Sequence, residues 1–463
     1  MVNSKSLLRS SNTVGSLQAD SRDLILKQTD FLLHQLFADT SLFEPSLLVA
    51  LSGGLDSVVL LHILSQLKAD LPFKLSAMHV HHGLSKNADT WTNFCKELCA
   101  KLNIPLSVKR VSVDKKSGLG IEAAARSVRN QALAESGADF ICLAHHQNDQ
   151  AETLLLQLAR GAGVKGLAGM AQIDLSRKLL RPLLNFSRLE LETYAKKNEL
   201  AWVDDESNLD ISFDRNFFRH DVLPIMMQRY PSIVQTLARS AANLAEASSL
   251  LDGLAELDTA KALNENPDRL NLGALEMLDS LRQANAFRWW LSQHKINMPS
   301  ALQLQQILQQ LYHARSDASI KLKVAEKQYL RRYQGDAYLV KEGAEIVPIN
   351  LLWQGEEMVN LPNDSRLIFT RKSGEGLVLP EGFKLRIMSR EGSERFKPEF
   401  GRPSRTLKHL MQTNRVPPWQ RVRIPLVYMD EMLVYIPNLG AAAEMQAKPN
   451  ETGYVITWEE NVA

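Results

Sequence analysis

The sequence predicts an α/β fold in which a parallel-sheet domain is followed by a mainly helical domain and a small α/β C-terminal domain. Residues 47–61, LLVALSGGLDSVVLL, place an apolar strand, a glycine-containing loop and an apolar helix in succession. Further strands are predicted at 74–80, 106–113 and 140–144. From Asp221 onward the chain becomes rich in Ala, Leu and Gln, which favours packed amphipathic helices.

The chain is long enough for roughly three domains, because it has 463 residues of which 45% are hydrophobic. Its first residues are serine-rich and aperiodic, which favours a flexible extension, with a transit peptide as the alternative. We expect this extension at 1–22, the parallel-sheet domain at 23–225, the helical domain at 226–348 and the C-terminal domain at 349–463.

Strand-like stretches also occur after residue 300. Alternating apolar and polar residues predict strands at 320–324 and 329–340, next to the helical region. In the C-terminal domain, strands are predicted near 367–370 and 383–388. The helical domain is therefore expected to carry some strand structure at its end.

Composition excludes several classes of protein. The apolar runs are shorter than the ~20 residues of a membrane span, and no signal-peptide pattern is present, so we expect a cytoplasmic protein. Cys95, Cys99 and Cys142 form an odd set without a CxxC pair, which fits neither a disulfide framework nor a zinc or iron-sulfur site. We expect them to be core or helix-face thiols.

The hexapeptide SGGLDS, residues 52–57, suits the binding of a polyanion. Gly53 and Gly54 allow a phosphate to approach the main chain, and Ser52 and Ser57 add hydroxyl donors. A helix is expected to begin near Leu55, and its exposed N-terminal amides would complete the anion site. The alternative is an ordinary glycine turn between a strand and a helix.

Asp56 is the unusual member of this loop, since a carboxylate beside phosphates is repelled unless a divalent cation lies between them. We therefore interpret Asp56 as a magnesium ligand and expect a magnesium-bound nucleotide, with helix capping by Asp56 as the alternative. No GxxxxGK[ST] motif occurs. SGGLDS instead resembles the pyrophosphate-binding loop of enzymes that cleave ATP between the α and β phosphates.

Polar residues follow the predicted strands at the carboxyl edge of the sheet, where ligands bind in open α/β folds. His79 lies at the end of the second strand, Arg126 on a helix beginning near Ile121, and His145 after the fourth strand. The histidines lack a recognised metal-ligand spacing, which argues against a transition-metal site.

Asp149 and Glu152 are three residues apart, so on a helix both carboxylates share one face and can hold an ammonium group or magnesium. The alternative is helix capping by Asp149 with Glu152 as its partner. The two interpretations are compatible.

Four blocks in order resemble the tRNA(Ile)-lysidine synthetase family: SGGLDS at Ser52, HVHHGLS at His79, GLGIEAAAR at Gly118 and LAHHQNDQAET at Leu143. LRPLL at 180–184 and the run at 204–219 are also similar to the family. One position departs from its pattern, because this chain has Asn148-Asp149 where the family usually has two adjacent acids. We therefore assign the carboxylate role to Asp149 alone.

The resemblance implies a ligase in which ATP adenylates carbon 2 of the wobble cytidine of an isoleucine tRNA with a CAU anticodon. The side-chain amine of L-lysine then attacks, and AMP and pyrophosphate leave. His79 is implied in nucleotide binding, and Arg126 and His145 in offsetting charge on the α-phosphate, although Arg126 is equally compatible with a surface position. Asp149, Glu152 or a histidine would accept the amine proton or orient the lysine.

A basic stretch at 402–423 contains no acidic residue in a chain whose formal net charge is +2. This composition suits contacts with a phosphate backbone, with a solvated helix face as the alternative. The resemblance implies that the C-terminal domain binds the tRNA acceptor arm and that the helical domain binds tRNA or links the other two. The expected tRNA-binding residues are Arg215, Arg219, Arg402, Arg405, Lys408 and Arg415.

Two other functions remain open at this point. The chain could belong to a related enzyme that thiolates a tRNA base, or it could be a nucleotide-sensing RNA-binding protein without catalysis. The sequence also leaves open whether the protein is a monomer or a homodimer, and which residues bind lysine.

Overall fold

The computed structural model describes residues 21–40, 42–83, 85–112, 121–206, 210–263, 266–315, 320–341, 347–362, 365–380 and 382–460. Most of the expected N-terminal extension and the glycine-containing loop before Ile121 lie outside these residues. The chain divides into two units, residues 1–250 and 251–463, which are described separately. Among the described residues, no helix combines the length and the apolar character needed to cross a membrane.

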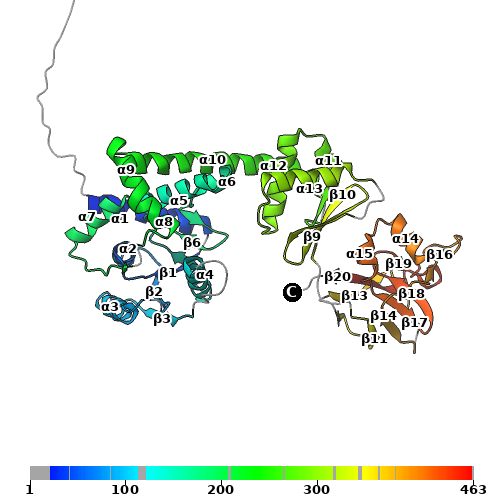
Figure 1. Cartoon of the computed structure of the whole chain (residues 1–463). Coiled ribbons are helices and arrows are strands. Elements are labelled where there is room, and N and C mark those ends of the chain that lie inside the picture. The colour runs from blue at the N-terminus through cyan, green and yellow to red at the C-terminus, as the bar shows by residue number, and fades with distance from the viewer. Residues whose placement is uncertain are drawn as a thin grey trace, which may run out of the picture. The chain divides into compact units, whose positions relative to one another are not determined.

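A six-stranded sheet with the order β3-β2-β1-β4-β6-β5 forms the centre of the first unit (Figure 1). All its neighbours pair in parallel except β5 and β6. The predicted strands are confirmed, although β3 and β4 end before the predicted positions. The strands are β1 (Ser46–Ala50), β2 (Lys74–His81), β3 (Leu106–Arg110), β4 (Phe140–Cys142), β5 (Ile173–Asp174) and β6 (Leu179–Leu180).

Helices connect and cover these strands. The first eight are α1 (Ser21–Thr40), α2 (Leu55–Leu67), α3 (Ala88–Lys101), α4 (Ile121–Ala134), α5 (Gln147–Ala159), α6 (Val164–Leu167), α7 (Arg188–Lys197) and α8 (Asp214–Phe217). A π-helical turn, η2 (Phe218–Val222), then joins α8 to α9 (Leu223–Arg229), and α10 (Ile233–Thr259) follows.

Strand β1 is apolar at successive positions because both faces of the sheet are covered. Leu47 and Val49 belong to the large core that α1, α2, α3 and α7 complete. Leu48 points the other way and packs with Leu133 of α4. Figure 1 shows α2 and α3 on one side of the sheet and α4 on the other. The carboxyl ends of β1, β2 and β4 are left for the loops that carry the polar motifs.

The second unit begins with a small α+β region. Its helices α11 (Leu272–Glu276), α12 (Ser280–Gln293) and α13 (Ala301–His313) pack on an antiparallel sheet of the order β7-β10-β9-β8. The stretch at 329–340 is two strands and not one, because Gln334 and Gly335 both have positive φ angles and make a tight turn. The strands are β7 (Arg269–Asn271), β8 (Lys321–Ala325), β9 (Gln328–Tyr333) and β10 (Asp336–Lys341).

The C-terminal part contains a five-stranded sheet, β11-β14-β17-β18-β19, and a three-stranded sheet, β12-β13-β20. Its predicted strands are confirmed as β13 and β14. The strands are β11 (Asn350–Trp353), β12 (Met358–Leu361), β13 (Ser365–Ser373), β14 (Leu385–Met388), β17 (Leu426–Met429), β18 (Met432–Ile436), β19 (Gly440–Ala441) and β20 (Thr452–Glu460). The basic stretch forms β16 (Arg405–Thr406), α14 (Leu407–Thr413) and α15 (Pro418–Arg421), with β16 paired to β15 (Arg395–Phe396).

Candidate functional site

The loop between β1 and α2 is folded around the hydroxyl of Ser57. The backbone amides of Ser52 and Gly53 both donate to Ser57 Oγ at 3.2 Å, and Ser57 Oγ donates to the carbonyl of Gly54 at 2.9 Å. Gly54 precedes the first turn of α2 and provides no side-chain cap. The first amides of α2 therefore have no capping side chain, and a helix N-terminus of this kind attracts anions.

The two glycines of this loop have different reasons to be glycine. Gly53 has a φ of +91°, and a Cβ on it would lie 3.0 Å from Val203 Cγ2 and 3.2 Å from Cys95 Sγ. Gly54 has an ordinary negative φ, and a Cβ on it would make only normal contacts. Gly53 is thus required by the fold, whereas Gly54 leaves the backbone open to a ligand.

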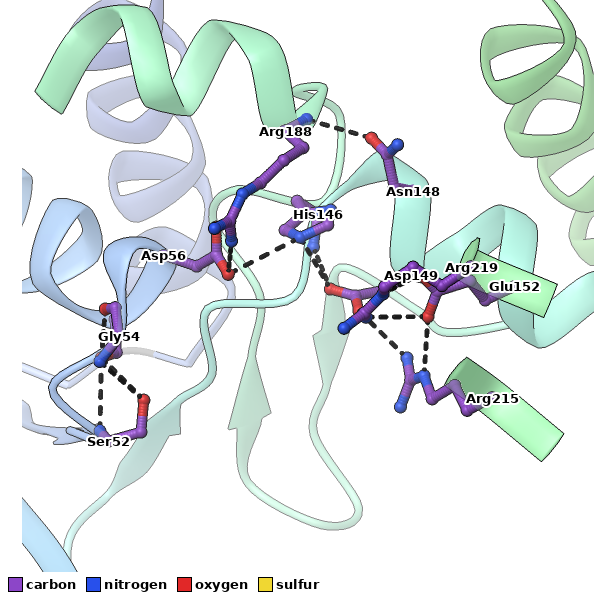
Figure 2. Close-up of polar contacts among 11 residues, drawn as sticks. Ser52, Gly54, Asp56, His146, Asn148, Asp149, Glu152, Arg188, Arg215 and Arg219 are labelled. Carbon is purple, nitrogen blue, oxygen red and sulfur yellow. Dashed lines mark hydrogen bonds and ion pairs between the residues drawn. The ribbon is translucent and has the colours of Figure 1, made fainter. Parts of the chain in front are cut away.

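Asp56 does not cap α2, since it lies within the first turn and its carboxylate pairs with Arg188 Nη1 of α7 (Figure 2). His146 Nε2 lies 3.7 Å from the same oxygen, Oδ2. Burial raises the pKa of Asp56 above its usual range, although the charges of His146 and Arg188 act in the opposite direction.

The other oxygen of this carboxylate, Oδ1, is buried and has no partner among the described residues. A free carboxylate oxygen beside an anion-binding loop fits Mg²⁺, which is usually held by one or two carboxylates together with phosphate oxygens. Among the described residues, no three or more His, Cys, Asp or Glu side chains are grouped so that they could hold a metal ion.

His146, which was not among the predicted site residues, lies between the acid of the loop and the acid of α5 (Figure 2). Its ring Nε2 is 3.5 Å from Asp149 Oδ2, and its backbone amide donates to that oxygen at 3.0 Å. Asp149 therefore caps α5, as the alternative interpretation predicted, but its partner in the cap is His146 and not Glu152. The signal for His146 was its position directly before the helix.

Asp149 and Glu152 are bound by two arginines of the α8–η2 segment. Arg215 Nε donates to Glu152 Oε2 at 2.9 Å, and Arg219 Nε donates to Glu152 Oε1 at 2.6 Å. Both guanidinium groups also reach Asp149 Oδ1 at 3.2 Å. Only 1% of the Glu152 side chain is exposed. The four side chains form a buried network that joins α5 to a segment more than sixty residues later in the chain.

The electrostatics of this network favour its ionised form. Burial acts to raise the pKa of Asp149, but the charges of His146 and Arg215 outweigh it, and the pKa lies below the usual range. Burial acts to lower the pKa of Arg219, but its bond to Glu152 raises the pKa above the ordinary value. Asp149 is therefore a carboxylate at neutral pH and a weak proton acceptor.

The predicted residues His145 and His79 are both tied to neighbours. His145 Nδ1 accepts a hydrogen bond from Arg181 Nε at 3.2 Å, and burial lowers the pKa of His145 to about 3. His79 Nδ1 bonds to the carbonyl of Leu51 at 2.9 Å, and burial lowers the pKa of His79. A neutral His145 can offer a phosphate a hydrogen bond but no positive charge. Arg126 lies near His145, since its charge contributes to the low pKa of that ring.

Asn148, at the position that departs from the expected pattern, is bound to α7. Its Oδ1 accepts a hydrogen bond at 3.0 Å from the backbone amide of Arg188, the first residue of that helix (Figure 2). An amide oxygen is sufficient for this bond. Arg188 itself carried no signal in the sequence, because its partner Asp56 is 132 positions away.

In the second unit, the basic stretch divides into exposed and structural residues. Lys408 and Arg415 are exposed, and Arg405 is partly exposed. Arg402 is also exposed but pairs with Glu399 at 2.8 Å. Arg421 is buried, and its Nε donates to the carbonyl of Val416, so this arginine supports the fold.

Three family models match the chain in order: a PP-loop domain at 27–226, a TilS substrate binding domain at 270–338 and a TilS substrate C-terminal domain at 385–458. A tRNA(Ile)-lysidine synthase from Nitrosomonas europaea is 40% identical over 93% of this chain and 95% of its own length. One from Coxiella burnetii is 38% identical over 90% and 94% of the two chains.

Among solved structures, the U34-tRNA thiolase NcsA from Methanococcus maripaludis superposes with a TM-score of 0.41 at 17% identity, covering 49% of this chain and 80% of its own. The sequence relatives match far more of the chain than this structure does. The matched PP-loop domain and the relatives that align over nearly the whole chain identify the same family. The chain belongs to the tRNA(Ile)-lysidine synthase family and is an ATP-binding ligase that forms carbon–nitrogen bonds.

Proposed function

We propose that this protein ligates L-lysine to carbon 2 of the wobble cytidine of the isoleucine tRNA with a CAU anticodon. ATP adenylates the cytosine oxygen, and lysine then displaces AMP, so that the tRNA reads AUA in place of AUG. The observation that supports this most directly is the position of Asp56, with one buried oxygen free among the described residues, at the uncapped end of α2. That arrangement suits ATP whose pyrophosphate carries a cation.

For the first step, the uncapped amides of the first turn of α2 would bind the pyrophosphate. Asp56 Oδ1 would hold Mg²⁺, which supplies charge neutralisation to the departing pyrophosphate. Arg188 keeps a positive charge beside Asp56 and opposes the effect of burial on its ionisation. The cytosine oxygen attacks the α-phosphate, and the α–β bond breaks.

For the second step, the side-chain nitrogen of lysine forms a bond to carbon 2, and AMP leaves with the former cytosine oxygen. Asp149 is ionised, so it suits holding a cation better than accepting a proton. Its neighbours Arg215 and Arg219 hold this carboxylate and that of Glu152 in position by ion pairs. We infer that the carboxylates of Asp149 and Glu152 attract the lysine ammonium before the amine loses its proton.

For tRNA, the exposed cations of the second unit provide contacts with phosphates that do not depend on sequence. Arg405, Lys408 and Arg415 would bind the acceptor arm. Such binding weakens as salt increases, because counterions are released from the RNA. A tRNA substrate also supports a location in the cytoplasm.

Base thiolation is not favoured as an alternative. Burial raises the pKa of Cys95 and Cys142 to about 12 and that of Cys99 to about 11. These thiols remain protonated at neutral pH, and a protonated thiol is a poor nucleophile and a poor cluster ligand.

The test is incubation of the full chain with ATP, Mg²⁺, labelled lysine and the CAU tRNA, followed by nuclease digestion and mass analysis of the wobble nucleoside. Lysine should enter this cytidine only in the presence of ATP and Mg²⁺, and Asp56→Ala should abolish incorporation. A transcript with a GAU anticodon is the matched substrate control. ATP cleavage without incorporation of lysine would contradict the proposal.

A further inference from the structure

Arg129 on α4 has a buried side-chain nitrogen with an unused hydrogen-bond donor among the described residues. Its Nε is shielded from solvent and has no hydrogen-bond partner in the part of the chain that the structure describes. Burial lowers the pKa of Arg129, and the charges of Arg126 and Arg215 lower it further. Among the described residues, the charges that act on the pKa of Arg129 are those of Arg126 and Arg215, so this guanidinium lies near like charges.

His82, just beyond the end of β2, also has a buried side-chain nitrogen without a hydrogen-bond partner among the described residues. That nitrogen is Nδ1. Burial lowers the pKa of His82, and the next largest cause is the charge of Arg129. Met78 of β2 and Leu133 of α4 pack in one core cluster, so His82 and Arg129 lie in the same region of the unit although they come from different elements. His82 is uncharged at neutral pH and can donate an N–H from this nitrogen.

The nearby acids do not compensate Arg129. Asp149 and Glu152 accept bonds from Arg215 and Arg219 instead. Asp205 acts on His82 but has interactions of its own. A buried donor without a partner costs about 1–3 kcal/mol, and more if it is charged. Two such donors in the same region, at the ligand-binding edge of the sheet, favour an anion as the missing partner.

We propose that Arg129 and His82 form a phosphate-binding subsite distinct from the Ser52–Ser57 loop. The planar guanidinium suits the oxygens of a phosphate group, and the imidazole adds one further donor. This subsite rests on the proposed function, since both candidate phosphates are substrates of that reaction. The phosphate is either the α-phosphate of ATP or a backbone phosphodiester of the tRNA next to the wobble nucleotide.

The test measures two dissociation constants separately for the wild type, Arg129→Gln and Arg129→Lys. One is that of Mg·ATP without tRNA, and the other is that of the CAU tRNA without ATP. We expect Arg129→Gln to weaken one of them about tenfold or more, and Arg129→Lys to restore part of the loss. A weaker ATP complex identifies the α-phosphate, and a weaker tRNA complex with a shallower salt dependence identifies the phosphodiester. Both constants within twofold of wild type would overturn the proposal.

Controls separate binding from folding. Arg177→Gln, at an exposed arginine of the same unit, should leave both constants unchanged. Arg129→Met removes the charge near Arg126 and Arg215 and the unpartnered Nε, so it should raise the melting temperature of the free protein while weakening binding of the same ligand. A free Arg129→Met protein with a lower melting temperature and unchanged binding would show a merely structural arginine. Neither binding measurement requires ligation of lysine. A failure of the proposed function can therefore be distinguished from a failure of the phosphate-binding subsite.

Discussion

Arg188 Nη1 donates to Asp56 Oδ2, which joins the first residue of α7 to the acid of the loop between β1 and α2. This pair leaves the second oxygen of Asp56 free of partners among the described residues. It also places a positive charge where burial alone would suppress the ionisation of Asp56. A residue from a distant helix thus favours the ionised form of Asp56 and opposes the effect of burial on its pKa.

Arg188→Gln should therefore move the acid limb of the pH profile for pyrophosphate release to higher pH. The proposed role of Asp56 as a magnesium ligand requires its ionised form, and loss of the guanidinium should raise the pKa of Asp56 further. Arg188→Lys keeps the charge and should shift the limb less. The melting temperature should change little, because 42% of the Arg188 side chain is exposed. An unchanged acid limb in Arg188→Gln would contradict this role.

Asn148→Asp should fold with the stability of the wild type or slightly more. The carboxylate keeps the acceptor for the amide of Arg188 and adds a negative charge at the N-terminus of α7, which is worth up to about 1 kcal/mol. Asn148→Ala removes the acceptor and should cost about 1 kcal/mol in urea unfolding. Equal stability of the alanine variant and the wild type would show that this bond is unimportant.

Gly54→Ala should separate ATP binding from folding. A Cβ at Gly54 meets no close contact, so the free protein should keep its stability while the affinity for Mg·ATP falls about tenfold or more. Gly53→Ala should instead lower stability by more than Gly161→Ala. Both positions have positive φ, but only Gly53 also meets close neighbours. Unfolding curves and ATP titrations of the three variants decide this, and full ATP affinity in Gly54→Ala would contradict the phosphate cradle.

Glu152→Gln should destabilise the protein by about 3 kcal/mol, because it leaves Arg215 and Arg219 with an incomplete partner in a buried site. The double variant Glu152→Gln with Arg219→Gln should lose less than the sum of the two single losses, since both substitutions break one network. Additive losses in urea unfolding would show that the network does not act as a unit.

The low pKa of the buried His145 ring should make the protein less stable in mild acid. The pKa of His145 in the folded protein is about 3 and that of an unfolded histidine is about 6.5, so between these values only the unfolded chain takes up the proton. Stability should fall as pH decreases below about 6.5, by about 2 kcal/mol at pH 5 from this residue. His145→Asn should reduce that fall, and an unchanged pH dependence would contradict a buried neutral ring.

The parallel sheet and the loop of Asp56 could be predicted because their signals are local. A short apolar strand, two glycines and an apolar helix are adjacent in the chain, and so are the polar residues that follow each strand. The division of residues 329–340 was missed because Gln334 gives no strong turn signal, although Gly335 after it permits the required positive φ.

The partners within the site could not be predicted, because they depend on the tertiary fold. Arg188 meets Asp56 over 132 positions, and Arg219 meets Glu152 over 67. Periodicity places residues on a face of a helix, but it does not identify which distant helix that face meets. His146 was the exception, since its contact with Asp149 lies within one turn of α5.

The most direct test distinguishes the proposed role of Asp56 in the ATP step from that of Asp149 in the lysine step. Two activities are measured for each variant: tRNA-dependent exchange of pyrophosphate into ATP, and ligation of lysine to the tRNA. Asp56→Asn should lose both activities, whereas Asp149→Asn should keep the exchange and lose ligation, with folding of both variants checked by thermal melting. If Asp56→Asn retains exchange, or if Asp149→Asn ligates lysine at the rate of the wild type, the account is wrong.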